Sequence, residues 1–143
     1  MTRIKESIYG KTPFERLLGH NVDIMKSWSR LGEVLEKGGY LSCDLKEQVR
    51  RTLAQSNGCA YCKAKGKPAP ATFDEKTAVA VGFAEVFLKQ KGAIQDSIFT
   101  LLKESFRDEE ISELCAFIAF STASQYFGAI MNLQAGGLNN ENK

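Results

Sequence analysis

The spacing of apolar side chains between the glycine and proline breaks is the feature that most limits what this chain can fold into. Apolar residues recur at three- and four-residue intervals, for example at Ile24, Trp28, Leu31 and Leu35. That spacing places side chains on one face of an α-helix. No stretch shows the sustained alternation with β-branched residues that is typical of strands. The sequence therefore predicts an all-α protein.

Capping residues and breaks divide the chain into expected helices. Thr12 and Thr72 each begin a capping box, Ser42 or Asp44 can cap a third helix, and Asp108 can cap the last. Glycines at positions 38 and 39 end the second helix. We expect helices over residues 12–19, 23–37, 43–56, 72–89, 94–106 and 109–133, with a short helix that begins at Cys59.

The length of 143 residues fits one domain with one hydrophobic core. We divide the chain into an N-terminal segment (residues 1–11), a single helical-bundle domain (residues 12–134) and a flexible tail (residues 135–143). The tail consists mainly of Gly, Asn, Glu and Lys, which cannot bury enough apolar surface to become ordered.

Charge and hydropathy exclude several classes of partner. The formal net charge of +2 gives no reason to expect nucleic acid or an anionic membrane surface. The longest apolar run, residues 114–120, is far shorter than the roughly 20 residues of a membrane span. The first residues lack the apolar stretch of a secretory signal, so we expect a cytoplasmic protein whose four cysteines start in a reducing compartment. We expect Cys59 and Cys62 to form a reversible disulfide, while Cys43 and Cys115 stay reduced.

The segment Cys59-Ala-Tyr-Cys62 carries the strongest chemical signal. In a reducing compartment a C-x-x-C pair is typical of a catalytic or metal-binding site rather than a structural disulfide. A helix that begins at this pair places one thiol near unpaired backbone N–H groups, which stabilise the reactive thiolate. Lysines at positions 63, 65 and 67 act in the same direction. The spacing lets one sulfur attack and the other resolve.

Two other interpretations of these cysteines stay open at the level of sequence. The pair can be two small buried apolar side chains without chemistry. A zinc site would need two more ligands, and the candidates are Cys43, Cys115 and His20, none of which forms a second close pair. We expect no cofactor and no metal.

Glu47 and His20 are candidate partners of the thiols. Glu47 lies on the side of its helix opposite the apolar stripe of Leu45, Val49 and Leu53. It is either a solvated or capping acid, or a carboxylate that relays a thiol proton. His20 is the only histidine, and its place at a helix end is typical of a partner for the helix dipole.

The last helix has an apolar surface wider than one stripe, which predicts a core position and, as a second interpretation, a subunit interface. The apolar residues in question are Phe117, Ile118, Phe120, Phe127 and Ile130.

Taken together, Glu47 followed after twelve and fifteen residues by Cys59 and Cys62 resembles the carboxymuconolactone decarboxylase family, and more narrowly its alkylhydroperoxidase D-like branch. Weaker similarities extend over residues 12–134. They are Leu41-Ser42 and Asn57-Gly58 around the motif, Arg16-Leu-Leu-Gly-His-Asn21 with Trp28, and the segment 108–114 that opens the last helix.

The resemblance implies an all-helical fold that assembles into trimers or hexamers. It also implies a thiol-dependent peroxidase or disulfide reductase that acts on a small peroxide or disulfide and is regenerated by a thiol reductant. In that family the second cysteine attacks, which corresponds to Cys62, while Cys59 resolves and Glu47 belongs to a proton relay.

The chain departs from the family pattern at one position. The family has a histidine four residues after the second cysteine, and this chain has Gly66 there. Tyr61, Lys63 or His20 are the candidates for an auxiliary role in its place. The departure also motivates an alternative, a weakly catalytic or non-catalytic redox-responsive or ligand-binding oligomer on the same scaffold.

Overall fold

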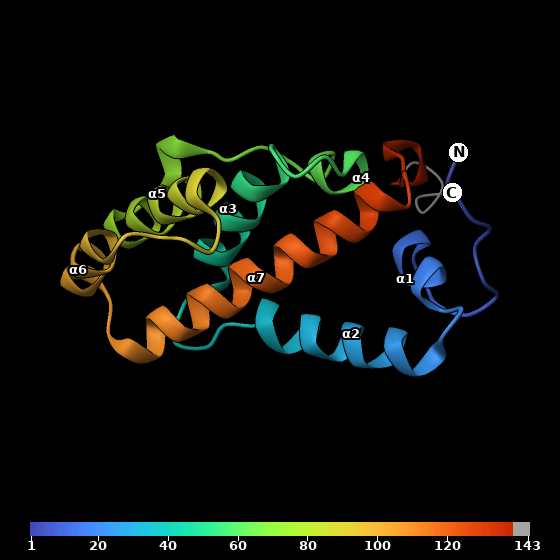
Figure 1. Cartoon of the computed structure of the whole chain (residues 1–143), viewed down its shortest axis with the longest axis horizontal. Coiled ribbons are helices and arrows are strands. Elements are labelled where there is room, and N and C mark those ends of the chain that lie inside the picture. Colours follow the sequence, from blue (N-terminus) through green and yellow to red (C-terminus); the bar gives the residue numbers. More distant parts are fainter. Residues whose placement is uncertain (139–143) are drawn as a thin grey trace.

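The structure, a computed structural model, describes residues 1–138, and these residues form seven α-helices and two short 3-10 helices without a strand. The α-helices are α1 (Pro13–Leu18), α2 (Val22–Glu36), α3 (Cys43–Ala54), α4 (Ala60–Lys63), α5 (Glu75–Gln90), α6 (Asp96–Ser105) and α7 (Asp108–Ile130). The 3-10 helices are η1 (Pro70–Thr72) and η2 (Ala135–Leu138). The predicted all-α class is confirmed for the described residues (Figure 1).

The caps of α1 and α3 lie where the sequence puts them. The Thr12 hydroxyl accepts a hydrogen bond from the Glu15 N–H at 3.1 Å. The Ser42 hydroxyl accepts one from the Leu45 N–H at 3.1 Å, so Ser42 rather than Asp44 caps α3. Each bond satisfies a backbone donor that the helix itself leaves unpaired.

Two expected caps are wrong. Asp74, not Thr72, caps α5 by accepting the Thr77 N–H at 2.7 Å, because residues 70–72 turn into η1 first. The N-cap of α7 is Arg107, one residue before Asp108, and its N–H donates to the Glu110 carboxylate at 3.0 Å. A side chain in the first turn therefore caps α7 from inside the helix.

The long helix α7 crosses the molecule and organises the other elements (Figure 1). Helix α3 packs against both α5 and α7, and α6 joins α5 and α7 at the same end of the molecule. At the other end α2 and α4 pack against α7, and α1 packs against α2. The molecule thus has a core end and an end that holds the cysteine pair.

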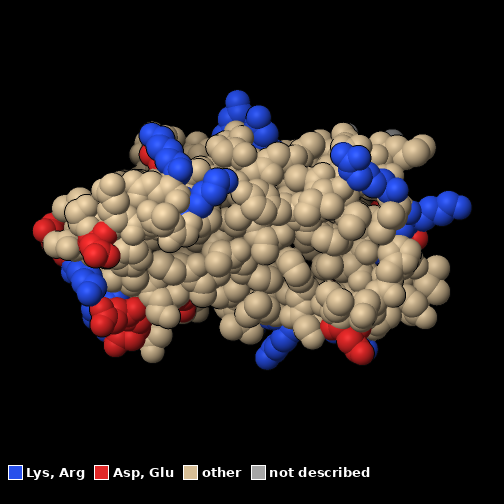
Figure 2. Space-filling view, in the orientation of Figure 1, with Lys and Arg blue, Asp and Glu red and all other residues tan. Residues whose placement is uncertain are grey.

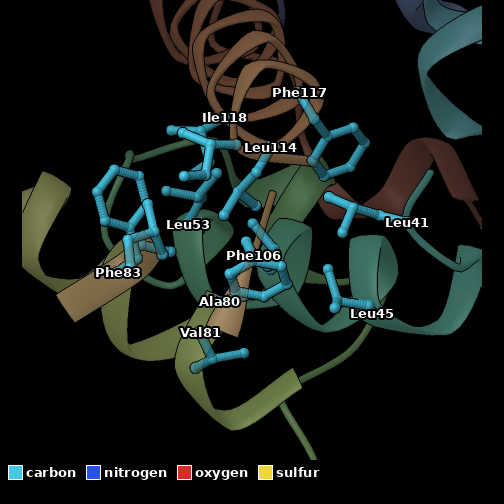
Figure 3. Packing of buried hydrophobic residues seen from close by; sticks show 14 residues of the cluster. Leu41, Leu45, Leu53, Ala80, Val81, Phe83, Phe106, Leu114, Phe117 and Ile118 are labelled. Atoms are coloured by element: carbon cyan, nitrogen blue, oxygen red, sulfur yellow. The ribbon is translucent and has the colours of Figure 1, made fainter. Parts of the chain in front are cut away.

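The main hydrophobic core lies between α3, α5 and α7 (Figure 3). Val49, Leu53, Ala80, Ala84 and Leu114 are all completely shielded from solvent. The two alanines lie four residues apart on one face of α5, where their small side chains let the helix approach its neighbours closely. This packing fixes α3, from which Glu47 and two arginines project.

A buried ion pair ties the α2–α3 connection to α7. The Lys46 side chain is only 2% exposed and its Nζ lies 3.3 Å from the Glu113 carboxylate. The same ammonium donates to the Lys37 carbonyl at 2.6 Å, and Glu113 accepts the Leu41 N–H at 2.8 Å. Because each charge has several partners, the pair holds the end of α2 in place.

The apolar residues of α7 divide between the core and the surface. Phe117 and Ile118 are buried, Phe120 and Phe127 are half-buried, and Ile130 is 63% exposed. The core position expected for this helix therefore holds for its middle, while the apolar surface near its end is open to solvent in the single chain.

The terminal segments pack on the dithiol side of the molecule. The Arg3 N–H donates to the Met131 carbonyl at 3.0 Å, and the Ser7 N–H donates to the Arg16 carbonyl at 2.9 Å. Of the tail expected to be flexible, Ala135–Leu138 forms η2. Residues 139–143 lie outside the described part of the chain.

Candidate active site

Cys59 and Cys62 form a disulfide in this structure, with their Cα atoms 5.2 Å apart. Cys59 is the N-cap of the short helix α4, and its Sγ accepts a hydrogen bond from the Cys62 N–H at 3.1 Å. Gly58 has a φ of +81°, a conformation that favours glycine and that turns the chain into α4. The two cysteines of the C-x-x-C motif are thus joined by a disulfide in the folded chain.

The other two cysteines are not in a disulfide. Cys43 is exposed at the start of α3, and Cys115 is half-buried on α7, where burial raises the pKa of its thiol. Neither is among the residues that pack with the Cys59–Cys62 pair.

Helix α7 closes over the disulfide at Gly128. A Cβ atom at this position would overlap the Cys59 Sγ atom and would lie 3.6 Å from the Cys62 Sγ atom. Cys59 is consequently 1% exposed and Cys62 8% exposed. Glycine is required here because the helix backbone itself covers the sulfurs.

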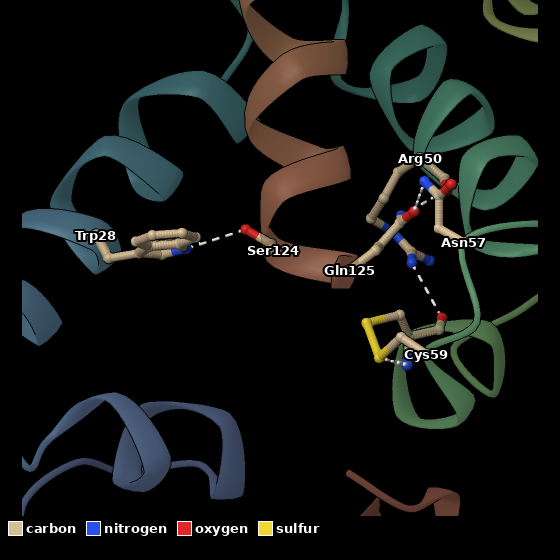
Figure 4. Close-up of a disulfide and its surroundings, with 7 residues drawn as sticks. Trp28, Arg50, Asn57, Cys59, Ser124 and Gln125 are labelled. Atoms are coloured by element: carbon tan, nitrogen blue, oxygen red, sulfur yellow. Dashed lines mark hydrogen bonds between the residues drawn. A yellow bond between two sulfur atoms is a disulfide. The ribbon is translucent and has the colours of Figure 1, made fainter. Parts of the chain in front are cut away.

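A chain of buried hydrogen bonds fixes the segment before the disulfide. The Asn57 amide donates to the Gln125 side-chain oxygen at 2.8 Å, and the Gln125 amide donates to the Arg50 carbonyl at 3.2 Å. Gln125 is 2% exposed. Because all three residues lie on different elements, this network joins α3, α7 and the approach to α4 (Figure 4).

Arg50 reaches from α3 to the cysteine pair, as Figure 4 shows. Its Nη1 donates to the Cys62 carbonyl at 3.2 Å. Its Nε and Nη2 donate to the two Glu47 oxygens at 3.0 and 2.7 Å, which is a two-point contact. Arg51 Nε adds a third bond to Glu47 at 3.0 Å.

The two arginines decide the charge state of Glu47. Burial raises the pKa of this carboxyl, but the hydrogen bonds and charges of Arg50 and Arg51 outweigh that effect and hold the pKa below its usual value. Glu47 is therefore ionised at neutral pH, and Arg50 links it to the Cys62 carbonyl.

A cavity of about 320 Å³ opens in front of the disulfide, between α2 and α7. Cys62 and Arg50 line it, whereas Cys59 and Glu47 do not. Much of the wall is aromatic and comes from Phe14, Trp28, Tyr61, Phe117 and Phe120. The volume lies at the lower end of the range for small-molecule sites.

Helix α2 forms the outer wall of this cavity. The Trp28 indole N–H donates to the Ser124 hydroxyl at 3.0 Å, a contact drawn in Figure 4. The Phe120 ring lies 3.4 Å from the position of a Cβ on Gly32. Two contacts of different kinds thus hold α2 beside α7.

The structure brings some of the expected auxiliary residues to the site and leaves others away from it. Tyr61 is buried and lines the cavity, and the Lys65 ammonium lies 4.6 Å from the centre of its ring. Lys63 is exposed and does not line the cavity. His20 is also exposed, and its Nε2 pairs with the Lys5 carbonyl at 2.6 Å rather than with a sulfur.

Sequence reasoning missed Arg50, Gln125 and Gly128. A signal for Arg50 was available, because Glu47 followed by arginines three and four positions later predicts ion pairs on one helix face. No local pattern distinguishes Gln125 or Gly128, since their roles depend on how α7 crosses α4.

Across residues 1–138, no group of three or more His, Cys, Asp or Glu side chains has an arrangement that could hold a metal ion. The zinc interpretation thus has no ligand set in that part of the chain. Within the same residues, every helix is too short or too polar to cross a bilayer.

No protein-family model matches this chain, and no curated protein is significantly similar to it in sequence. The geometry of the cysteine pair and its cavity is therefore what indicates a function for this chain.

Proposed function

We propose that this protein is a thiol-dependent oxidoreductase that reduces a small hydroperoxide or disulfide through Cys59 and Cys62. The observation that carries the proposal is the unequal access to the two sulfurs. Cys62 lines the cavity, while α7 covers Cys59 at Gly128. A substrate that enters the cavity meets Cys62, so Cys62 attacks and Cys59 resolves.

With a hydroperoxide, the Cys62 thiolate attacks the terminal peroxide oxygen. An S–O bond forms, the O–O bond breaks, and the alcohol leaves after taking a proton. The Cys59 thiolate then attacks the Cys62 sulfur, and hydroxide leaves and is protonated to water. Cys62 has been oxidised to a sulfenic acid and then to the disulfide, and the peroxide has been reduced.

A thiol reductant then reduces the Cys59–Cys62 disulfide back to the dithiol. Its thiolate attacks Cys62 Sγ from the cavity and forms a mixed disulfide, and Cys59 leaves as a thiolate. The Cys62 N–H donates a hydrogen bond to Cys59 Sγ at 3.1 Å. This bond stabilises the Cys59 thiolate, which makes Cys59 a good leaving group. A second thiol from the reductant then releases Cys62.

The all-helical fold and the spacing of Glu47 from the cysteine pair support an assignment to the alkylhydroperoxidase D-like branch of the carboxymuconolactone decarboxylase family. In this proposal Glu47 acts indirectly, since it holds Arg50 and does not line the cavity. Tyr61 is the auxiliary candidate at the cavity wall.

The test is turnover of an organic hydroperoxide and of a small disulfide, with dithiothreitol as reductant. Cys62→Ser should lower both rates by at least about 10³-fold, because it removes the attacking sulfur. With the hydroperoxide and without the reductant, Cys59→Ser should stop after one turnover at a Cys62 sulfenic acid that dimedone traps. Cys43→Ser is the matched control and should keep full turnover. A Cys62→Ser protein that retains turnover would contradict the proposal.

A redox-responsive binding protein is the second candidate, and the position of His20 favours it. The chain has one histidine, and its ring pairs with Lys5 away from the cavity, so the family's proton relay is not available. In that case Cys59 and Cys62 would oxidise and reduce reversibly, but neither substrate would be turned over. Stopped-flow turnover beside a redox titration of the same protein separates the two functions.

We also propose that the chain forms a homo-oligomer, a trimer or hexamer as the family resemblance implies. One exposed stripe of α7 has a spacing of three and four residues and consists of Ala116, Ala119, Ala123, Tyr126 and Ile130. Charged side chains lie mainly around the edge of the face in Figure 2, across which α7 runs in Figure 1. An uncharged helix stripe of this kind suits packing against another copy.

Sedimentation at micromolar concentration tests this assembly. Ala123→Glu should shift the protein toward monomer, because it places a charge in the centre of the stripe. Ala78→Glu, at an exposed alanine of α5, is the matched control and should leave the assembly intact. A wild-type protein that sediments as a monomer would exclude the assembly.

A further inference from the structure

The cavity has a permanent cation, Arg50, in the same wall region as Cys62. Arg50 lines the same cavity as Cys62, and its guanidinium is 3.2 Å from the Cys62 carbonyl oxygen. Its side chain is 15% exposed, so solvent screens its charge less than that of a surface arginine. Figure 4 shows the guanidinium directed from α3 toward the disulfide.

Arg50 is held at both ends. Glu47 fixes the guanidinium through two oxygens, and the buried Gln125 amide fixes the Arg50 carbonyl at 3.2 Å. A long side chain normally loses rotamer freedom when it is held in one position. Here that cost is met in the folded protein, before any substrate arrives.

The other charged or titratable groups that line the cavity come from three segments of the chain and partly oppose one another. Glu15 belongs to α1, Glu33 and Glu36 belong to α2, and Tyr61 and Lys65 lie in and just after α4. The lining residues of α7 are uncharged. The Glu33 side chain is 64% exposed and weakly paired with Arg30, so water screens it strongly.

Resting on the function proposed above, we infer that Arg50 is the residue that activates Cys62, by stabilising its thiolate with a charge that does not titrate. An opposite charge at about 4–6 Å typically lowers a pKa by one to three units. Arginine stays protonated across the accessible pH range. The reactivity of Cys62 should therefore follow the thiol alone, without the second inflection that a histidine gives near pH 6.5.

The experiment measures the alkylation rate of Cys62 against pH with iodoacetamide, a neutral reagent. The background protein is the full chain with Cys43→Ser, Cys59→Ser and Cys115→Ala, so that Cys62 is the thiol observed. We expect one inflection at least about one unit below the free-thiol value of about 8.5. Arg50→Gln should raise it by about one unit, and Arg50→Lys should restore part of the shift.

Arg51→Gln is the matched control, because Arg51 also binds Glu47 but does not line the cavity. It should move the inflection by less than a third as much as Arg50→Gln. An equal shift in both variants, or no shift in a folded Arg50→Gln protein, overturns the inference. If Arg50→Gln does not fold, the background protein alone still tests the inference. An inflection of its alkylation rate at or above about pH 8.5, or a second inflection between about pH 5.5 and 7.5, overturns the inference.

Alkylation needs no turnover, so this result is independent of the proposed enzymatic function. A low Cys62 pKa that depends on Arg50, in a protein without turnover, would support this inference and contradict the peroxidase or reductase. Turnover by a protein whose Cys62 has an unperturbed pKa would support the proposed enzymatic function and contradict this inference.

Discussion

The two ends of the molecule are built on different principles. At the core end, α3, α5 and the first half of α7 bury large apolar side chains, and Leu53 and Leu114 are fully shielded. At the dithiol end, a cavity separates α2 from the cysteine pair. In α2, which the structure describes completely, Gly32 is the only buried residue.

Helices α3 and α7 therefore carry the residues that stabilise the fold at one end and the residues of the candidate site at the other. Helices α3 and α7 run through both ends, and each contributes core residues at one end and site residues at the other. Val49 of α3 is buried in the core, while Arg50 beside it lines the cavity. The packed end supplies the rigidity that a preorganised site needs.

The largest effect should come from a cavity in the core end. Leu114→Ala should lower the free energy of unfolding by about 2–5 kcal/mol, because the site is fully buried and cannot collapse easily. Leu31→Ala on α2, at a side chain that is 49% exposed, is the matched substitution and should cost less than about 0.5 kcal/mol. Urea unfolding measures both.

An equal loss in the two variants would break the comparison. It would mean that the outer face of α2 is packed as well as the core, which in this chain requires a second copy against it. Repeating the measurement at several protein concentrations would then reveal that contact.

The next effect concerns an ion pair that fastens α7 to α5 at the core end. The Lys76 ammonium lies 2.8 Å from Glu110, and bonds from Lys76 and Arg107 lower the pKa of this buried carboxyl to about 2. A carboxyl with a lowered pKa stabilises the fold above its unfolded pKa and loses that contribution as the pH falls. About 3 kcal/mol should be lost between pH 5 and pH 2.

Glu110→Gln isolates this contribution, because it removes the titration and leaves the side chain's shape. The difference in unfolding free energy between wild type and Glu110→Gln should shrink steadily below about pH 4.5. A difference that stays constant down to pH 2 would show that Glu110 contributes only its cap to Arg107.

The sequence could predict the helices at both ends because local signals agree there with the packing. Apolar spacing, Pro13, the Ser42 cap and the glycines after α2 placed the helices within a few residues of their observed bounds. The caps predicted at Thr72 and Asp108 were wrong. Residues 70–72 form η1 before α5 begins, and the Glu110 side chain caps α7 from within its first turn. Helix existence follows from periodicity, whereas helix ends depend on single side chains.

The dithiol end could be predicted only in part. The spacing of the two cysteines is visible in the sequence, but whether Glu47 and His20 reach the cavity depends on how the elements pack. Glu47 is separated from the cavity by Arg50, and His20 is drawn to the Lys5 carbonyl fifteen residues before it. The contact between Gly128 and Cys59 has a separation of 69 residues and no local pattern.

A smaller effect should follow from restoring the family's histidine. Gly66 has a φ of +132°, and a Cβ there would lie 3.1 Å from the Arg51 guanidinium carbon. Gly66→His should therefore destabilise the protein by roughly 1–3 kcal/mol. It should not raise turnover. Gly66→Ala is the control and should cost a similar amount, since the strain belongs to the backbone; a stable, more active Gly66→His would show that the loop can rearrange.

The smallest effect that we expect is at Glu47, and it decides what this carboxylate does. Glu47→Gln keeps the shape of the side chain but removes the charge that holds Arg50 and one of its two strong acceptors. If Glu47 acts by orienting Arg50, turnover should fall by about tenfold, and the pH profile should keep its form. If Glu47 itself carried a proton, the loss should reach about 10²–10⁴-fold and one limb of the profile should disappear.

Glu85→Gln, at an exposed position of α5, is the matched control and should keep full turnover. Unchanged turnover in Glu47→Gln would make Glu47 a surface acid that merely pairs with two arginines, and the chemistry of the dithiol end would then rest on Cys59, Cys62 and Arg50.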